Sequence, residues 1–285
     1  MSRPELTVRT ALRPRSPARR PTAILVGAIV LAFAIVLALA PTPYDPNAQL
    51  SGGLARNGLP LAPSLHHLLG TDTLGRDELS RVLAGGRISL LVGTLGSLFA
   101  TSIGTAIGLV AGYFRRWVGM ILMRFTDVMM AFPYLLLAVA LQAVIGPGIS
   151  NLLLVIAAVT WVNAARVMNG LALTESSKDY IAALEVFGAR NARIILRHLL
   201  PNLAAPAMVL FTTGVGYTIL LEATLSYLGL GVQPPTATWG NMVREGQAYF
   251  QSAPWLVITP GALIVLSVVA VNVVGEQITE LRRTN

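Results

Sequence analysis

Cysteine is absent from this 285-residue sequence, which excludes disulfide bonds, thiolate metal sites and cysteine nucleophiles. Charge is also scarce: 12% of the residues are charged, whereas soluble domains carry about 25%. Hydrophobic residues make up 54% of the chain, and the mean hydropathy is +0.66. The composition therefore predicts a membrane protein, and helices are the expected structure because they satisfy their own backbone hydrogen bonds in hydrocarbon.

Sequence motifs of catalysis are missing as well. Lys178 is the only lysine and Asp179 follows it, so the phosphate-binding pattern G-x-x-x-x-G-K-[ST] cannot occur and ATP hydrolysis by this chain is not expected. The sequence also lacks H-E-x-x-H and G-x-S-x-G, the patterns of zinc proteases and serine hydrolases. We interpret His66, His67 and His198 as structural. We predict no enzyme activity, no catalytic residue, and no cofactor or metal bound by this chain.

The formal net charge of +8 could indicate binding to nucleic acid. The basic residues, however, form short clusters between long apolar runs and make no continuous basic face. Membrane topology explains that arrangement better, so the lipid bilayer is an expected partner and nucleic acid is not.

Apolar runs long enough to cross a bilayer, which takes about 20 residues, predict six transmembrane helices. The region 128–165 is long enough for two helices, with Gly146-Pro147-Gly148 as the turn between them. The run 22–40 follows an arginine-rich tail and resembles a secretory signal, but its length and Pro41 favour a retained helix. The spans are expected in 22–40, 88–114, 128–165 (two), 203–221 and 255–275.

Basic residues concentrate in cytoplasmic loops of membrane proteins. If the N-terminus is cytoplasmic, sixteen of the 21 lysines and arginines are inside. We therefore predict a cytoplasmic tail at 1–21, an external loop with a short helix at 41–87, an internal loop at 166–201, and both termini in the cytoplasm. The inside set is Arg3, Arg9, Arg13, Arg15, Arg19, Arg20, Arg115, Arg116, Arg124, Arg166, Lys178, Arg190, Arg193, Arg197, Arg282 and Arg283; Arg56, Arg76, Arg81, Arg87 and Arg244 are outside.

Two features inside the predicted spans need interpretation. Gly104, Gly108 and Gly112 recur every four residues, which places them on one helical face where another helix can pack closely. Glu222 is the one acidic residue that could couple transport to ions. We interpret it as a half-exposed residue at the outer end of its span. The uncharged stretch that follows contains Gly229, Gly231, Pro234 and Pro235, which favour an interfacial loop.

The internal loop contains the segment Asp179–Leu200, which predicts two short helices separated by Gly188 and Asn191 and ended by Pro201. Ile181, Leu184 and Phe187 recur every three residues and share one face. Such a helix can dock into a groove on a partner protein. A helix that lies on the membrane surface is the alternative.

The same segment resembles the EAA loop of binding-protein-dependent ABC permeases. Ala183, Gly188 and Pro201 match its pattern, with Pro201 thirteen residues after the glycine. Ala182 stands at the acidic position and Leu184 at the second alanine. The resemblance implies that this loop is a coupling helix seated in a cleft of an ATPase subunit, with Gly188 as its pivot. The implied coupling residues are Asp179, Tyr180, Ala182, Ala183, Leu184, Phe187, Gly188, Ala189 and Pro201.

The external segment Leu69–Asp77 and its continuation to Gly93 resemble the dipeptide/oligopeptide/nickel (DppC/OppC-like) permease subfamily. The segments Ala131–Pro133 and Leu225–Pro235 resemble it too, so the likeness extends from Leu69 to the C-terminus. A helix cap at Asp77, with Arg81 four residues on, accounts for the external segment, and docking of a receptor is a further hypothesis. The signature residues are Gly70, Thr71, Asp72, Gly75, Arg76 and Asp77.

This resemblance implies an all-α membrane protein whose last five helices, in 88–285, form a MetI-like ABC importer permease core. It implies a heterodimer with a second homologous permease, two ATPase subunits that hold ATP and Mg²⁺, and an extracytoplasmic solute-binding protein. The location is the cell membrane of a prokaryote. The expected cargo is a dipeptide or oligopeptide, with nickel or another small solute as the alternative. An ion-coupled secondary transporter, an intramembrane enzyme and an exporter are the rival classes.

Overall fold

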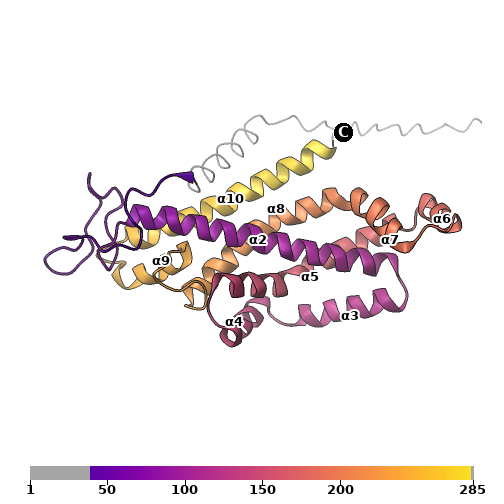
Figure 1. The fold of residues 1–285 in the computed structure, drawn as a ribbon, viewed down its shortest axis with the longest axis horizontal. Helices are drawn as coiled ribbons and strands as arrows, with labels where there is room; N and C mark the ends of the chain where they lie inside the picture. Colours follow the sequence, from indigo (N-terminus) through magenta and orange to yellow (C-terminus); the bar gives the residue numbers. More distant parts are fainter. Residues whose placement is uncertain (1–38, 284–285) are drawn as a thin grey trace, which may run out of the picture.

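The computed structural model describes residues 39–283, with side chains to residue 275. The predicted tail and nearly all of the predicted first span, 22–40, lie outside the described residues. Long helices run side by side along the molecule (Figure 1), and the only strand-like pairing in the described part is two isolated bridges. The elements are α2 (Glu78–Tyr113), α3 (Trp117–Ala131), α4 (Tyr134–Ile145), α5 (Ile149–Glu175), α6 (Asp179–Val186), α7 (Asn191–Ile194), a π-helix (Ile195–Leu199), α8 (Leu200–Tyr227), α9 (Trp239–Gly246), a 3-10 helix (Gln247–Tyr249) and α10 (Trp255–Arg283).

Four of these helical segments are long and apolar enough to cross a membrane. They are α2, α5, the continuous stretch Asn191–Tyr227, and Trp255–Gly275 of α10. The pair α3 and α4 passes the same test together but is bent by 88° at the break between them, so the described residues hold up to five spans. The all-α membrane fold is confirmed, and the predicted span that this structure does not describe is the first, 22–40.

The bounds of the first of the two spans predicted in 128–165 differ from those in the structure. The helix begins at Trp117 rather than near residue 128, and it breaks at Phe132, whose backbone is extended. Pro133 explains the break, because proline restricts the preceding residue to extended conformations. The prediction that Arg124 lies in a cytoplasmic loop is therefore wrong, since Arg124 is inside α3.

The start of the internal loop also differs from the prediction. The helix α5 continues to Glu175, so Arg166 lies within a spanning helix and not at the edge of a loop. An arginine is tolerated there because it has an acidic partner: its guanidinium is paired with Asp127 of α3.

The glycine stripe of α2 packs against α5, as predicted. A Cβ atom at Gly104 would lie 2.5 Å from the carbonyl oxygen of Trp161, and one at Gly108 would lie 2.6 Å from that of Ala165. At Gly112 it would lie 2.5 Å from the Cβ of Ala172. Side chains at these positions would push the two helices apart, so the glycines allow the close contact at the centre of the bundle.

The stretch after α8 was predicted as an interfacial loop, and part of it is instead the buried helix α9. Thr238 caps this helix, and its side chain and that of Asn241 bond reciprocally to each other's backbone amides. Trp239 is fully buried, and its indole nitrogen donates to the carbonyl of Val82 in α2 at 3.0 Å. The helix is held because its tryptophan fills space beside α2.

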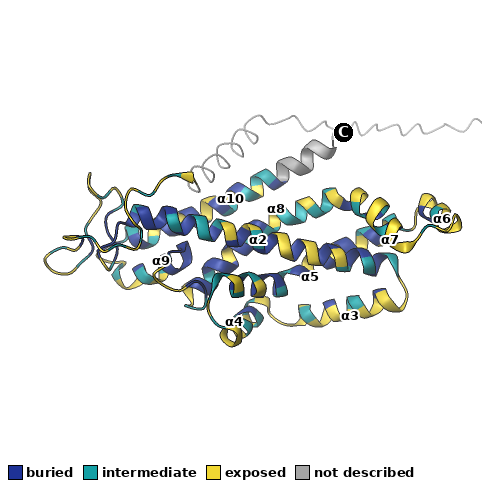
Figure 2. Cartoon of the chain, in the orientation of Figure 1, coloured by how far each residue is buried: buried dark blue, intermediate teal, exposed yellow. Residues whose placement is uncertain are grey.

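The two segments with sequence signatures lie at opposite ends of the bundle. The loop that precedes α2 lies at the same end as α9, and α6 and α7 lie at the other end (Figure 1). Burial is greatest along α2 and α5 and in the half of α8 near α9, whereas α3 and α6 are largely exposed (Figure 2). The inner structure is thus a tight bundle with α6 projecting from one end.

Candidate functional site

The helix α6 ends in a hydrogen-bonded cap that depends on Gly188. The amide of Gly188 donates to the carbonyl of Glu185, and the amide of Ala189 donates to that of Leu184, each at 3.0 Å. These two bonds form the Schellman motif, which requires a left-handed residue at the position after the cap. Gly188 has φ of +76° and fills that position without strain. The glycine therefore fixes how the chain leaves α6.

The apolar face predicted for this segment is divided in two. Ile181 is buried in a cluster with Ile194 and Leu199, and Leu184 packs against that cluster. Phe187, expected on the same face, is 88% exposed, and its neighbour Val186 is 86% exposed. Thus α6 is anchored to the bundle by one side, while two large apolar side chains at its end contact nothing that the structure describes.

The polar side chains around α6 connect it to the ends of the spanning helices. The hydroxyl of Tyr113, at the end of α2, donates to Glu185 at 3.0 Å. The hydroxyl of Tyr180 donates to Glu175 of α5 at 2.9 Å and accepts from Asn202 of α8 at 3.0 Å. These contacts tie one short helix to α2, α5 and α8 together.

Lys178, which immediately precedes α6, adds an ion pair to the same network. Its ammonium lies 2.7 Å from a carboxylate oxygen of Glu175. The hydrogen bond to Glu175 raises the pKa of Lys178, so the only lysine of the chain is charged at neutral pH. Exposed pairs of this kind contribute little to stability, and the pair serves to position the start of α6.

Pro201 does not end the helical segment, contrary to the prediction. It lies in the first turn of α8, within a helix that is continuous from Asn191 to Tyr227. Proline crowds the carbonyl four residues earlier in a regular helix. Here a π-helix precedes it, with the amide of Leu200 donating to the carbonyl of Ile195, and such a turn is wider. The wider turn lets the segment Asn191–Leu199 continue directly into α8.

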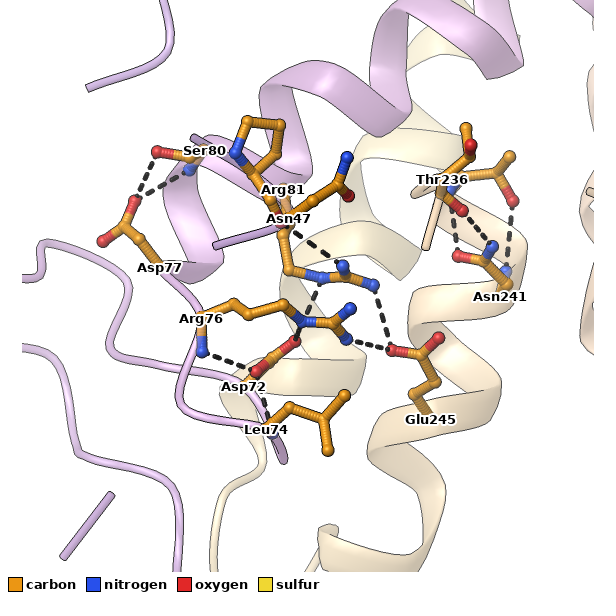
Figure 3. Close-up of polar contacts among 12 residues, drawn as sticks. Asn47, Asp72, Leu74, Arg76, Asp77, Ser80, Arg81, Thr236, Asn241 and Glu245 are labelled. Atoms are coloured by element: carbon orange, nitrogen blue, oxygen red, sulfur yellow. Dashed lines mark hydrogen bonds and ion pairs between the residues drawn. The ribbon is translucent and has the colours of Figure 1, made fainter. Parts of the chain in front are cut away.

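At the opposite end, the external signature builds a buried cluster of charges between α2 and α9. Asp72 accepts from the amide of Arg76 at 2.8 Å and pairs with its guanidinium at 2.6 Å. Arg81 of α2 lies 3.1 Å from Asp72 and 3.0 Å from Glu245 of α9 (Figure 3). Arg76 contacts the same Glu245 carboxylate at 3.2 Å. The cluster joins the external loop, α2 and α9.

Asp77 forms the predicted helix cap, but the helix is α2 itself rather than a separate short one. Its carboxylate accepts from the amide of Ser80 at 2.9 Å and from the hydroxyl of Ser80 at 2.7 Å. The other carboxylate oxygen lies 2.9 Å from a ring nitrogen of His67. Arg81, four residues on, pairs with other carboxylates because its side chain turns toward α9.

The remaining signature residues shape the turn of this loop. The Thr71 hydroxyl donates to the carbonyl of Gly53 at 2.6 Å and accepts from the amide of Leu61 at 2.8 Å. Gly70 and Gly75 have φ of +74° and +75°, which favours glycine. Thr71, Asp72, Arg76 and Asp77 are all buried, so they have little surface for a partner. Docking of a receptor at this loop stays a prediction, and it would involve exposed neighbours.

Sequence reasoning missed Glu245 and was wrong about Glu222. Glu245 lies 164 residues after Arg81, and no local pattern connects the two. Glu222 is fully buried rather than half exposed, and it accepts from the hydroxyl of Ser226 at 2.7 Å. Its place in α8 beside α9 explains the burial, because α9 covers a stretch that was expected to be an open loop.

Residues 39–275 contain no group of three or more side chains placed to hold a metal ion.

Curated relatives cover most of this chain. It is 38% identical over 260 residues to the dipeptide transport system permease protein DppC of Alkalihalophilus pseudofirmus, covering 88% of this chain and 82% of that protein. It is 39% identical over 259 residues to the di/tripeptide transport system permease protein DppC of Pseudomonas aeruginosa, covering 87% and 82%. It is also 38% identical over 261 residues to the glutathione transport system permease protein GsiD of Escherichia coli, covering 90% and 85%.

A chain of the MetNI methionine ABC transporter, solved in inward-facing conformations, shares the fold. The TM-score is 0.53 at 17% identity, over 69% of this chain and 94% of that chain. At this identity the likeness concerns the fold alone. Residues 104–281 match the family described as binding-protein-dependent transport system inner membrane component. With a match over more than half of its length and relatives close to 40% identical, this multi-pass membrane protein belongs to the binding-protein-dependent transport system inner membrane component family, the permeases of ABC importers.

Proposed function

We propose that this permease carries dipeptides or oligopeptides across the cell membrane of a prokaryote, driven by separate ATPase subunits that press on α6. One observation carries the proposal: α6 is anchored to three spanning helices and ends in two exposed apolar side chains, Val186 and Phe187. An exposed apolar end outside the membrane fits insertion into a groove of another protein.

ATP and Mg²⁺ are bound by the ATPase subunits in this proposal, and this chain binds neither. The support is chemical, since a phosphate-binding loop needs a lysine after glycine and the only lysine here follows Ser177. Closure of the ATPase pair would move α6, and its ties to α2, α5 and α8 would pass the motion on as a rigid-body shift. This chain thus acts as the transport component rather than as the enzyme.

The proposed assembly contains a second homologous permease, which completes the route, and an extracytoplasmic solute-binding protein that delivers the cargo. Both termini are cytoplasmic. The excess of basic residues near α6 supports that orientation, because Arg115, Arg116, Arg190, Arg193 and Arg197 lie in or between the elements at that end. The loop before α2 then faces the solute-binding protein.

Peptide cargo is supported by the names of three relatives, which transport dipeptides, tripeptides or glutathione. Glutathione is itself a tripeptide, so these solutes share a free carboxylate and an amide backbone. Nickel is the second candidate. Competition between labelled dipeptide and nickel for uptake by the reconstituted transporter distinguishes the two.

The coupling role is tested by replacing the apolar end of α6. We expect Val186→Ser with Phe187→Ser to abolish peptide uptake and the stimulation of ATP hydrolysis by the loaded receptor. The amount of the chain in the membrane should stay unchanged, because neither side chain is buried. Val186→Leu with Phe187→Leu is the matched control, since it keeps both exposed side chains apolar. Normal uptake in the serine double variant would overturn the coupling role.

A further inference from the structure

Polar side chains are exposed at the middle of two spanning helices. Asn163 is exposed near the centre of α5, and Thr213 is exposed near the centre of α8. At a rise of about 1.5 Å per residue, each lies roughly 18–21 Å from both ends of its helix. The hydroxyl of Thr213 donates to the carbonyl of Val209 in its own helix at 2.9 Å, but an asparagine amide at that depth faces protein or a water-filled space rather than lipid. This face of the bundle is therefore unsuited to hydrocarbon.

Two adjacent cavities lie on this face. One, of about 220 Å³, lies between α2, α5 and α8. The other, of about 360 Å³, lies where α3 meets α4. Thr160, Asn163 and Tyr217 line both, so hydroxyl and amide groups lie on the wall that the two share, and we call the pair the hollow. Tyr134 lies on its far side, with its ring 5.1 Å from that of Tyr217.

The break between α3 and α4 opens this hollow. Because the helix turns by 88° at Phe132-Pro133, no straight helix covers Asn163. The last carbonyls of α3 lack partners within their own helix, and broken helices at membrane depth occur only where protein or a water-filled cavity surrounds them. The segment Ala131–Pro133, noted first as a sequence likeness, thus forms one wall of the hollow.

Three charges stand about one helical turn beyond the hollow, on the side of α6. Arg166 follows Asn163 by three residues, and its guanidinium is paired with Asp127. Arg124 lies 3.8 Å from the same carboxylate and is 80% exposed. Two guanidinium groups share one carboxylate, so the group carries a net positive charge and attracts an anion.

We infer that this hollow and its three charges form a cargo-binding site within the membrane, in which Thr160, Asn163 and Tyr217 bond to peptide amides and Arg166 receives the free carboxylate. The inference rests on the proposed peptide transport and names the groups of this chain that touch the cargo. The alternative, a second permease packed into the hollow, is an outcome of the test below.

The absence of cysteine allows a direct test by thiol labelling. Asn163→Cys and Thr213→Cys are introduced singly, and the transporter is reconstituted with its partner subunits. A membrane-impermeant methanethiosulfonate reagent should modify both positions, at rates that change with nucleotide and fall when receptor and dipeptide are added. Leu154→Cys is the matched control, because this exposed leucine lies nine residues before Asn163, on the opposite face of α5. If Asn163→Cys and Thr213→Cys react no faster than Leu154→Cys in every nucleotide state, this face is a packed surface and the proposed site is wrong.

The role of Arg166 is tested with two cargoes. We expect Arg166→Gln to slow uptake of a free dipeptide about ten-fold, as for the loss of one charged hydrogen bond, and to affect the dipeptide amide, which has no carboxylate, much less. Equal slowing of both cargoes would overturn the assignment to the carboxylate. ATP-dependent uptake by the unmodified chain, measured in the same vesicles, reports on the proposed function independently of this site.

Discussion

Gly188 fixes the local structure at the end of α6, and in the proposed mechanism it also contributes to coupling. Its φ of +76° is natural for glycine, and a Cβ there would meet no atom within 4 Å. A substitution therefore acts through the backbone alone. For other L-residues the left-handed conformation costs roughly 1–2 kcal/mol of conformational free energy, and asparagine tolerates this conformation best.

We expect Gly188→Val to reduce peptide uptake strongly, because the altered cap moves Val186 and Phe187 relative to the bundle. Gly188→Asn should retain most of the uptake, since asparagine can adopt the same conformation. Transport by membrane vesicles containing equal amounts of the two variants makes the comparison. Equal uptake by both variants would show that the backbone conformation at the end of α6 does not affect transport.

The glycine stripe of α2 permits a similar comparison on stability. In Gly108→Ala the new Cβ would lie 2.6 Å from the carbonyl oxygen of Ala165, whereas Gly170→Ala places one in open space. We expect Gly108→Ala to lower the free energy of unfolding by about 1–3 kcal/mol through overpacking. Gly170→Ala should have no effect or stabilise slightly through helix propensity. Thermal denaturation of the purified protein in detergent measures both, and similar Tm values would contradict the packing role.

Residue roles that depend on near neighbours were predictable from the sequence, and those that depend on distant partners were not. The Asp77 cap and the glycine stripe follow from spacings of three and four residues. The partners of Arg81 and the burial of Glu222 depend on α9, which is brought beside α2 and α8 only by the folded chain. Arg166 was placed in a loop because its acidic partner, Asp127 of α3, is a tertiary contact 39 residues away.

At the scale of elements, α9 is held to the external loop and α2 by buried charge pairs. Arg81 is fully buried, and Glu245 is 25% exposed. Removing Arg81 leaves two carboxylates, those of Asp72 and Glu245, for the single guanidinium of Arg76, and breaking a buried pair costs about 3–5 kcal/mol. We expect Arg81→Gln to lower the Tm markedly, whereas Lys178→Gln, at an exposed pair, should leave the Tm nearly unchanged. Equal shifts of the Tm in the two variants would contradict the structural importance of the charge cluster between α2 and α9.

Helix boundaries show why apolar runs alone do not define elements. Pro133 and Pro201 both interrupt apolar stretches, yet the chain bends by 88° at the first and continues through the second. The difference comes from the turn before each proline, which is extended at Phe132 and a π-helix before Leu200. A hydropathy pattern does not show the backbone conformation before a proline. The sequence therefore predicted a loop that ends at Pro201 and did not predict the break at Pro133.

At the scale of the whole molecule, the orientation in the membrane can be measured with single cysteines, since the chain has none of its own. Leu65 and Phe187 are highly exposed at opposite ends of the bundle. We expect an impermeant thiol reagent to label Leu65→Cys in right-side-out vesicles and Phe187→Cys only in inverted ones. The reverse pattern would place α6 outside the cell and exclude contact with a cytoplasmic ATPase.

The contacts of α6 connect it to long helices, so a displacement of α6 would be transmitted along the length of the bundle. Helix α2 has 36 residues, a length of about 54 Å, and both of its ends are fastened to neighbouring elements. If the bundle turned about its inner end by about 15°, as subunits of haemoglobin do, the far end of α2 would travel about 14 Å. If ATPase subunits move α6 as proposed, a small displacement of this short helix would thereby become a larger displacement at the opposite end of α2.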